Sequence, residues 1–146
     1  FGLRDSETKT TEWVIPGDAT IALSYPNGRS DVQFSCSGQD FTDQKATSQT
    51  GGTACLRVTN NGNQALIING SWTGAWQSGI TNVEMSIGDD TNSTSLTYTS
   101  GNCQTNQTWV ASLAQSGTED FWMWSTGSSV AEGTHQQTLT VWSDPA

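Results

Sequence analysis

The sequence predicts a single all-β domain, a β-sandwich of jelly-roll or immunoglobulin-like type with about nine short, mostly antiparallel strands. Three observations lead to this fold class. Apolar residues alternate with polar ones in segment after segment, as they do in half-buried strands. Turn-forming Gly, Asn and Pro residues separate these segments at intervals of roughly ten residues. No segment has the three- and four-residue spacing of an amphipathic helix.

Each predicted strand is a group of apolar residues placed two positions apart. Residues 38–53 contain Phe41 but no such alternation, so we expect a long loop there. In chain order, the predicted strands contain Ile21, Leu23 and Tyr25; Val32 and Phe34; Leu56 and Val58; Leu66 and Ile68; Val83, Met85 and Ile87; Leu96 and Tyr98; Trp109, Ala111 and Leu113; Phe121 and Met123; and Leu139 and Val141.

The length of 146 residues suits one domain. Residues 16–146 form the predicted sandwich, and residues 1–15 differ from them in carrying charged and apolar clusters. This segment is either an edge strand of the same sandwich or a strand that pairs with a neighbouring subunit. Its charged side chains are Arg4, Asp5, Glu7, Lys9 and Glu12, and its apolar ones are Phe1, Leu3, Trp13, Val14 and Ile15.

Neutral polar residues dominate the composition. Ser, Thr, Asn and Gln make up 60 of the 146 residues, and the net charge of −9 reflects only 5 basic side chains. These dispersed cations cannot displace the counterions of a nucleic acid, which excludes that class of partner. No apolar run approaches the roughly 18 residues of a membrane-spanning helix. Because the chain begins with Phe1, we expect a processed or trimmed protein without a membrane span.

The chain has three cysteines and one histidine, and no two cysteines have the close spacing of zinc ligands. We therefore expect a disulfide, with three internal pairings open. The pair Cys36 and Cys55 closes the shortest loop and is favoured, which leaves Cys103 unassigned. A disulfide indicates a compartment outside the cytoplasm.

Three Asn-x-Ser/Thr sequons begin at Asn69, Asn92 and Asn106. Each is either a glycosylation site or a chance match in a chain rich in these residue types. Together with the cysteines, the sequons favour an extracellular location at the cell surface.

Residues suited to catalysis are sparse. The single histidine, His135, has no GxSxG serine motif to act on and fits a surface or turn position. Glu119 and Asp120 are adjacent, so on a strand they point to opposite faces and do not form a hydrolytic carboxylate pair. Asp89 and Asp90 lack the spacing of an EF-hand loop and fit a hairpin turn. We expect no enzyme activity, no cofactor and no metal site.

The tryptophans are the most distinctive feature. Trp122 and Trp124 share one face of a predicted strand, and Phe121 and Met123 share the other. One of these two sets should be buried, and the other should face outward or towards a partner. Exposed indoles can stack on sugar rings or fill a contact between subunits, whereas buried ones belong to the core. The candidate residues for such stacking are Trp72, Trp76, Trp122 and Trp124.

Two stretches carry a resemblance to a known family. The start, FGLRD at residues 1–5, resembles the mature amino terminus of the TasA/camelysin family and of the archaeal bundling pilins similar to it. Residues 56–68, LRVTNNGNQALII, resemble that family's strand, Asn-Gly turn and strand. The resemblance implies a jelly roll whose subunits polymerise when an amino-terminal donor strand completes the sheet of the next subunit.

Residues 60–63 and 133–141 also look like the β-sandwich heads of archaeal type IV pilins and archaellins. Those proteins carry a long hydrophobic helix at the amino terminus, and residues 1–15 contain none. This departure favours the donor-strand class.

The predicted function is therefore a structural subunit of an extracellular filament, a pilus or biofilm fibre, whose partners are copies of itself. The residues expected at the contact between subunits are Phe1, Leu3, Trp13, Val14, Ile15, Trp122 and Trp124. Two alternatives stay open at this point: a carbohydrate-binding or adhesion module that uses exposed tryptophans on glycans or neighbouring cell surfaces, and the globular head of an archaeal pilin or archaellin.

Overall fold

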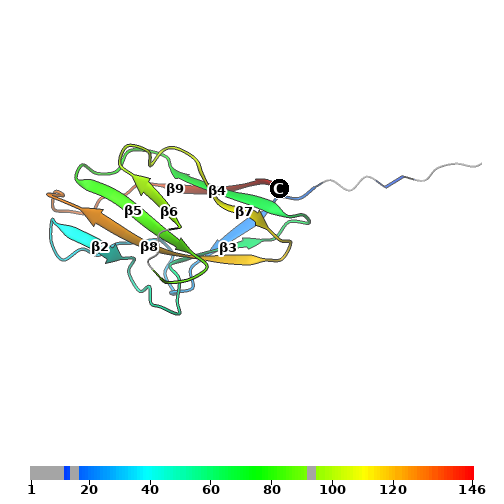
Figure 1. The fold of residues 1–146 in the computed structure, drawn as a ribbon, viewed down its shortest axis with the longest axis horizontal. Helices are drawn as coiled ribbons and strands as arrows, with labels where there is room; N and C mark the ends of the chain where they lie inside the picture. Colours follow the sequence, from blue (N-terminus) through cyan, green and yellow to red (C-terminus); the bar gives the residue numbers. More distant parts are fainter. Residues whose placement is uncertain (1–11, 14–16, 92–94) are drawn as a thin grey trace, which may run out of the picture.

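The computed structural model describes residues 12–13, 17–91 and 95–146 and contains two antiparallel β-sheets packed face to face (Figure 1). The described residues form strands, turns and irregular segments, and no helix. The predicted all-β sandwich is confirmed. The strands are β1 (Ile21–Ser24), β2 (Phe41–Lys45), β3 (Leu56–Asn60), β4 (Leu66–Trp72), β5 (Ile80–Ile87), β6 (Leu96–Thr99), β7 (Gln107–Leu113), β8 (Thr118–Gly127) and β9 (Leu139–Pro145).

The two sheets differ in size. The larger sheet has six strands in the order β1-β3-β8-β5-β6, and β2 also pairs with β8. Strand β8 is long enough to serve both, since residues 118–121 pair with β3 and residues 124–127 pair with β2. The smaller sheet has three strands in the order β7-β4-β9. The larger sheet is therefore four to five strands wide, and the three-stranded sheet cannot cover it completely.

The core lies between the sheets and is built from the alternating residues that the sequence predicts. Each such side chain that leaves water contributes about 1.5–3 kcal/mol to folding. Their polar neighbours in the strands point to the outer faces, as the two-residue period of a strand requires. The most deeply buried apolar residues are Leu56, Val58, Leu66, Ile68, Met85, Tyr98, Phe121 and Met123.

A hydrogen-bonded cluster joins the two sheets where β6 lies beside β7. The Tyr98 hydroxyl accepts a hydrogen bond from Trp109 Nε1 at 2.8 Å and donates one to the main-chain oxygen of Gly70. The indole lies directly against the backbone there, because a Cβ on Gly70 would sit only 2.3 Å from Trp109 Cζ2. This cluster closes the β6/β7 side of the sandwich.

Two stretches differ from the predicted elements. Val32 and Phe34 lie in an extended segment that pairs in no ladder of the described structure, so the predicted strand there is wrong. Conversely, the loop predicted for residues 38–53 contains strand β2. This strand has no apolar alternation because it is held mainly by main-chain pairing with β8, with a register shift next to Asp43, whose φ is 47°.

Removing one oxygen atom tests the cluster that closes the sandwich. The substitution Tyr98→Phe leaves the Trp109 indole N–H and the Gly70 carbonyl without this partner in a site where Tyr98 is 0% exposed. We expect the free energy of unfolding, measured by urea denaturation, to fall by about 1–3 kcal/mol. The matched control is Tyr25→Phe at the half-buried second tyrosine, with an expected change within about 0.5 kcal/mol. Equal effects of the two variants would contradict this role of Tyr98.

Candidate functional site

The sandwich is open on the side opposite the Tyr98 cluster. In the described structure β9 pairs only with β4, and β1 pairs only with β3, so each presents an unpaired edge. A groove of about 1050 Å³ begins on this side, at Leu139 and Val141, and extends inward to Trp72 and Val83, which lie next to Tyr98. Residues 30–39 and 130–139 supply most of its lining. The structure therefore leaves a cleft where the two sheets are not joined.

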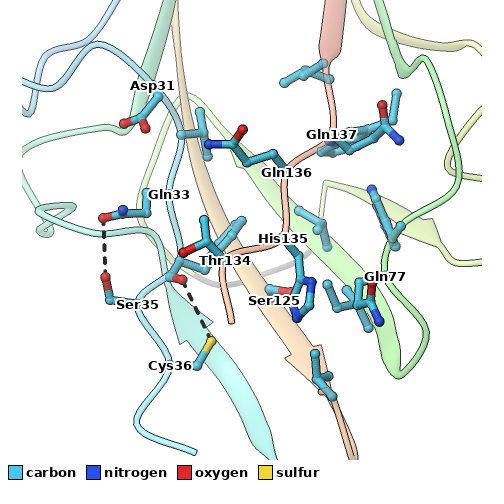
Figure 2. Close-up of a pocket in the computed structure, with 18 of the residues that line it drawn as sticks. Asp31, Gln33, Ser35, Cys36, Gln77, Ser125, Thr134, His135, Gln136 and Gln137 are labelled. Carbon is cyan, nitrogen blue, oxygen red and sulfur yellow. Dashed lines mark hydrogen bonds between the residues drawn. The ribbon is translucent and has the colours of Figure 1, made fainter. Parts of the chain in front are cut away.

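Two extended segments form the walls of this groove (Figure 2). The segment 30–38 carries Gln33 and Ser35, whose side chains hydrogen-bond to each other at 3.3 Å. The segment 131–138 leads into β9 and carries His135, whose Nε2 lies 2.6 Å from the main-chain oxygen of Ala131. Neither segment belongs to a β-ladder among the described residues. The rim of the groove is therefore polar, and much of its backbone has no partner strand.

The floor of the groove is apolar and incompletely covered. Leu23 of β1 is 40% exposed, although it alternates with the core-packing residues Ile21 and Tyr25. Eight further apolar side chains at the groove are half-buried, whereas Leu56, Trp72, Val83 and Val130, which also line it, are buried. A chain segment placed here would bury further apolar area, worth about 25 cal/mol per Å². The half-buried group contains Tyr25, Val32, Phe34, Phe41, Trp76, Ile80, Leu139 and Val141.

The groove lies towards one end of the β4–β9 ladder. At this end Trp72 pairs with Leu139, and both residues line the groove. At the other end Leu66 pairs with Pro145, and neither lines it. The ladder contains seven pairs, so its two ends are six residues apart, a distance of roughly 20 Å along the strands.

The chain enters the sandwich at the end of the ladder that is away from the groove. Asp18 donates its main-chain N–H to Asn63 Oδ1 at 2.7 Å, and Asn63 donates its own N–H to the Asp18 oxygen at 3.1 Å. The Ser143 hydroxyl donates to the main-chain oxygen of Ala19. Residues that precede this point are therefore attached at one end of the subunit, while the groove lies towards the other end.

The tryptophans of β8 do not face a partner. Trp122 and Trp124 are buried together with Phe121 and Met123, so the prediction that one set faces outward is wrong. Residues 46–54 fold over the outer face of β8 and cover the two indoles; Trp122 Nε1 donates to the Thr50 oxygen at 2.8 Å. The prediction that Trp122 and Trp124 lie at a contact between subunits is therefore wrong, because both side chains are buried within the chain.

The remaining residues predicted to contact another subunit or to stack on sugars are Trp72 and Trp76 in the sandwich and the apolar residues of the amino-terminal segment. Trp72 is buried and packs edge-on against Trp76 and Tyr98, with ring centroids 5.1 Å apart in both pairs. Trp72 therefore offers no stacking face. Trp13 is 78% exposed. The other candidates of the amino-terminal segment, Phe1, Leu3, Val14 and Ile15, lie outside the described residues.

All three cysteines are free, so the predicted disulfide between Cys36 and Cys55 is wrong. The Cys55 thiol lies in the core and points at the main-chain oxygen of Phe121, 3.3 Å away, and burial raises its pKa to about 12. Cys103 is also buried. Cys36 is exposed on the 30–38 wall of the groove.

The sequons differ in access. Asn69 is 3% exposed in the centre of the smaller sheet, where its side chain contacts Asp144 Oδ2 at 3.1 Å and the Thr108 hydroxyl at 3.2 Å. A glycan does not fit there without opening the sheet. Asn106 is exposed in the turn before β7 and is accessible. Asn92 lies outside the described residues.

The carboxylates among the described residues do not gather into a reactive cluster. Asp120 forms an ion pair with Arg57 on the neighbouring strand, with contacts of 2.6 and 3.0 Å. Asp89 accepts hydrogen bonds from Thr91 within its own turn. Among the described residues no three His, Cys, Asp or Glu side chains converge as metal ligands would. Over the same part of the chain no helix is long and apolar enough to cross a membrane.

Comparisons of this chain with protein-family models, with curated proteins and with solved structures find no match. The resemblance of residues 1–5 and 56–68 to the TasA/camelysin family stays a prediction from the sequence. The groove and the two unpaired edges beside it are therefore the features of the fold that bear on function.

Thiol labelling tests the state of the cysteines. Because thiolates react and buried thiols do not, iodoacetamide should alkylate Cys36 in the folded chain and spare Cys55 and Cys103. Partial burial also raises the pKa of Cys36, so its labelling rate should increase with pH towards and beyond 9. Mass spectrometry of the peptides gives the result, and the denatured chain, in which all three should react, is the control. A disulfide-linked peptide pair would contradict this assignment.

Proposed function

We propose that this chain is a structural subunit of an extracellular filament in which residues 1–15 of one copy insert as a strand into the groove of the next copy. The observation that carries the proposal is the apolar groove between the unpaired edges of β1 and β9. An unpaired edge beside uncovered apolar side chains is a liability in a monomer, because it binds other chains. In a polymer the same edge and apolar side chains form the contact between neighbouring subunits.

The amino-terminal segment has the chemistry of an occupant for such a groove. An inserted strand forms main-chain hydrogen bonds with an edge and places every second side chain into the groove. Residues 1–15 contain two apolar pairs with this spacing, Phe1 with Leu3 and Trp13 with Ile15. Asp5, Glu7 and Lys9, between the two pairs, would point to the same face of a continuous strand, so only a short strand limited to one of the two pairs has a largely apolar inner face.

The position of the two features supports a linear polymer. The segment joins the sandwich at the Pro145 end of β9, and the groove lies towards the Leu139 end. A contact between two different surfaces of identical subunits is heterologous and propagates head to tail unless its rotation closes a ring. Fifteen extended residues reach up to about 50 Å, which is more than the roughly 20 Å length of β9.

The carbohydrate-binding alternative has less support. It requires exposed indoles in a row, and Trp72, Trp122 and Trp124 are buried in this chain. A filament on the cell surface agrees with the neutral, hydroxyl-rich composition and with the accessible sequon at Asn106.

Deletion of residues 1–15 tests the proposed function. We expect the full chain to form filaments visible by negative-stain electron microscopy and the truncated chain to form none, because the inserted strand is lost. Tryptophan fluorescence and circular dichroism serve to establish that the truncated chain retains the sandwich. The control is a full chain with Thr10→Ala, between the two apolar pairs, which should assemble normally. Filaments from the truncated chain would refute strand exchange by this segment.

A further inference from the structure

We infer that the inserted strand pairs with the free edge of β9, through the main-chain groups of Leu139, Val141 and Ser143. The inference rests on the proposed function and names the edge that receives the segment. It also commits to one occupant, residues 1–15 of a second copy of this chain. The direction in which each peptide group of β9 points carries this assignment.

Opposite residues in an antiparallel ladder alternate between pairs that exchange two hydrogen bonds and pairs that exchange none. Two bonds fix the phase of this alternation for β4 and β9. Thr73 donates its N–H to the Thr138 oxygen at 2.9 Å, and Ala146 donates to the Ala65 oxygen at 3.0 Å. The register between these two points is continuous. The even-numbered residues of β9 therefore bond to β4, and the odd-numbered ones direct their N–H and C=O groups to the open edge.

Two independent features agree with this phase. The N–H of Trp72, an even-numbered residue of β4, donates to the Cys103 oxygen at 2.8 Å on the side away from β9. Pro145, which has no N–H to donate, occupies an odd position of β9, where its ring removes no ladder bond. Proline also ends the useful part of the edge, so the accepting stretch is Leu139 to Ser143.

The side chains of the same residues lie towards the groove. Leu139 and Val141 pack against the core, are only half-buried and line the groove. A strand paired with them would therefore direct its inward side chains beside theirs, between the two walls that Figure 2 shows. One inserted strand would then satisfy the open main-chain groups and cover the exposed apolar floor, and the smaller sheet would grow from three strands to four.

The edge of β1 is the competing site. Its phase is similar, because Asn61 donates its N–H to the Thr20 oxygen at 2.9 Å, which leaves the peptide groups of Ile21 and Leu23 facing outward. However, β1 has four residues against seven in β9, and it belongs to the sheet that already has six strands. The observations therefore favour β9.

Proline substitution in the full chain separates these edges. Val141→Pro removes an N–H that faces the open edge and spares the bonds to β4, and Val141→Ala is the control for the lost side chain. We expect Val141→Pro to raise the critical concentration for filament formation, measured by sedimentation, at least about tenfold above that of Val141→Ala. Leu139→Pro and Leu139→Ala form a second pair with the same expectation. Circular dichroism of unassembled subunits verifies the fold of each variant.

The outcomes distinguish the edge from the function. If both proline variants fold and assemble as well as their alanine controls, the assignment to β9 is overturned, even when deletion of residues 1–15 still abolishes filaments. If Leu23→Pro blocks assembly and Val141→Pro does not, β1 is the receiving edge. If one proline variant fails to fold, the comparison of the other proline variant with its alanine control decides the assignment. If the full chain stays monomeric with Leu139 and Val141 amides protected from exchange, the segment occupies its own groove and the second-copy assignment is wrong.

Discussion

The pairing of main-chain hydrogen-bonding groups at sheet edges is the constraint on which the rest of this structure depends. A sandwich has four edges, and each must be paired, covered or left to water. On one side, hydrogen bonds between Tyr98, Trp109 and the Gly70 main chain hold the edge strands β6 and β7 together across the two sheets. On the other side β1 and β9 pair in no ladder with each other, and eight of the apolar side chains that line the groove there are only half-buried.

Because of this asymmetry, one side of the sandwich is incompletely covered within a single chain. The smaller sheet has three strands against six, so part of the inner face of the larger sheet has no opposing strand. A ligand that binds only the folded state stabilises it by mass action, and a strand from a second subunit acts in the same way. In the proposed filament, part of the stability of each subunit therefore comes from its neighbour, because the inserted strand packs against the same hydrophobic core that stabilises the fold.

Local patterns predicted the elements well where apolar side chains determine them. Eight predicted strands lie at observed ones, because alternation such as that of Leu56 and Val58 reflects one face buried in the core. Strand β2 was missed because main-chain pairing with β8 holds it and its sequence carries no apolar period. Val32 and Phe34 alternate as in a strand, yet the groove beside them holds no partner.

Long-range packing explains the other failures. Residues 46–54, which cover Trp122 and Trp124, are about 70 positions away in the sequence. The alternation within β8 therefore could not predict that both indoles are buried. The same holds for Cys36 and Cys55, which are close in sequence but lie on the groove wall and in the core. The groove itself arises from the unequal width of the two sheets, a property of topology that no single segment encodes.

Amide hydrogen exchange in assembled filaments shows whether a second strand pairs with the free edge of β9. In the unassembled subunit the amides of Thr140 and Trp142, which bond to β4, should exchange slowly, and those of Leu139, Val141 and Ser143 should exchange quickly. The account predicts that all five are protected in the filament. Filaments in which Leu139, Val141 and Ser143 still exchange quickly, beside protected Thr140 and Trp142, would contradict it.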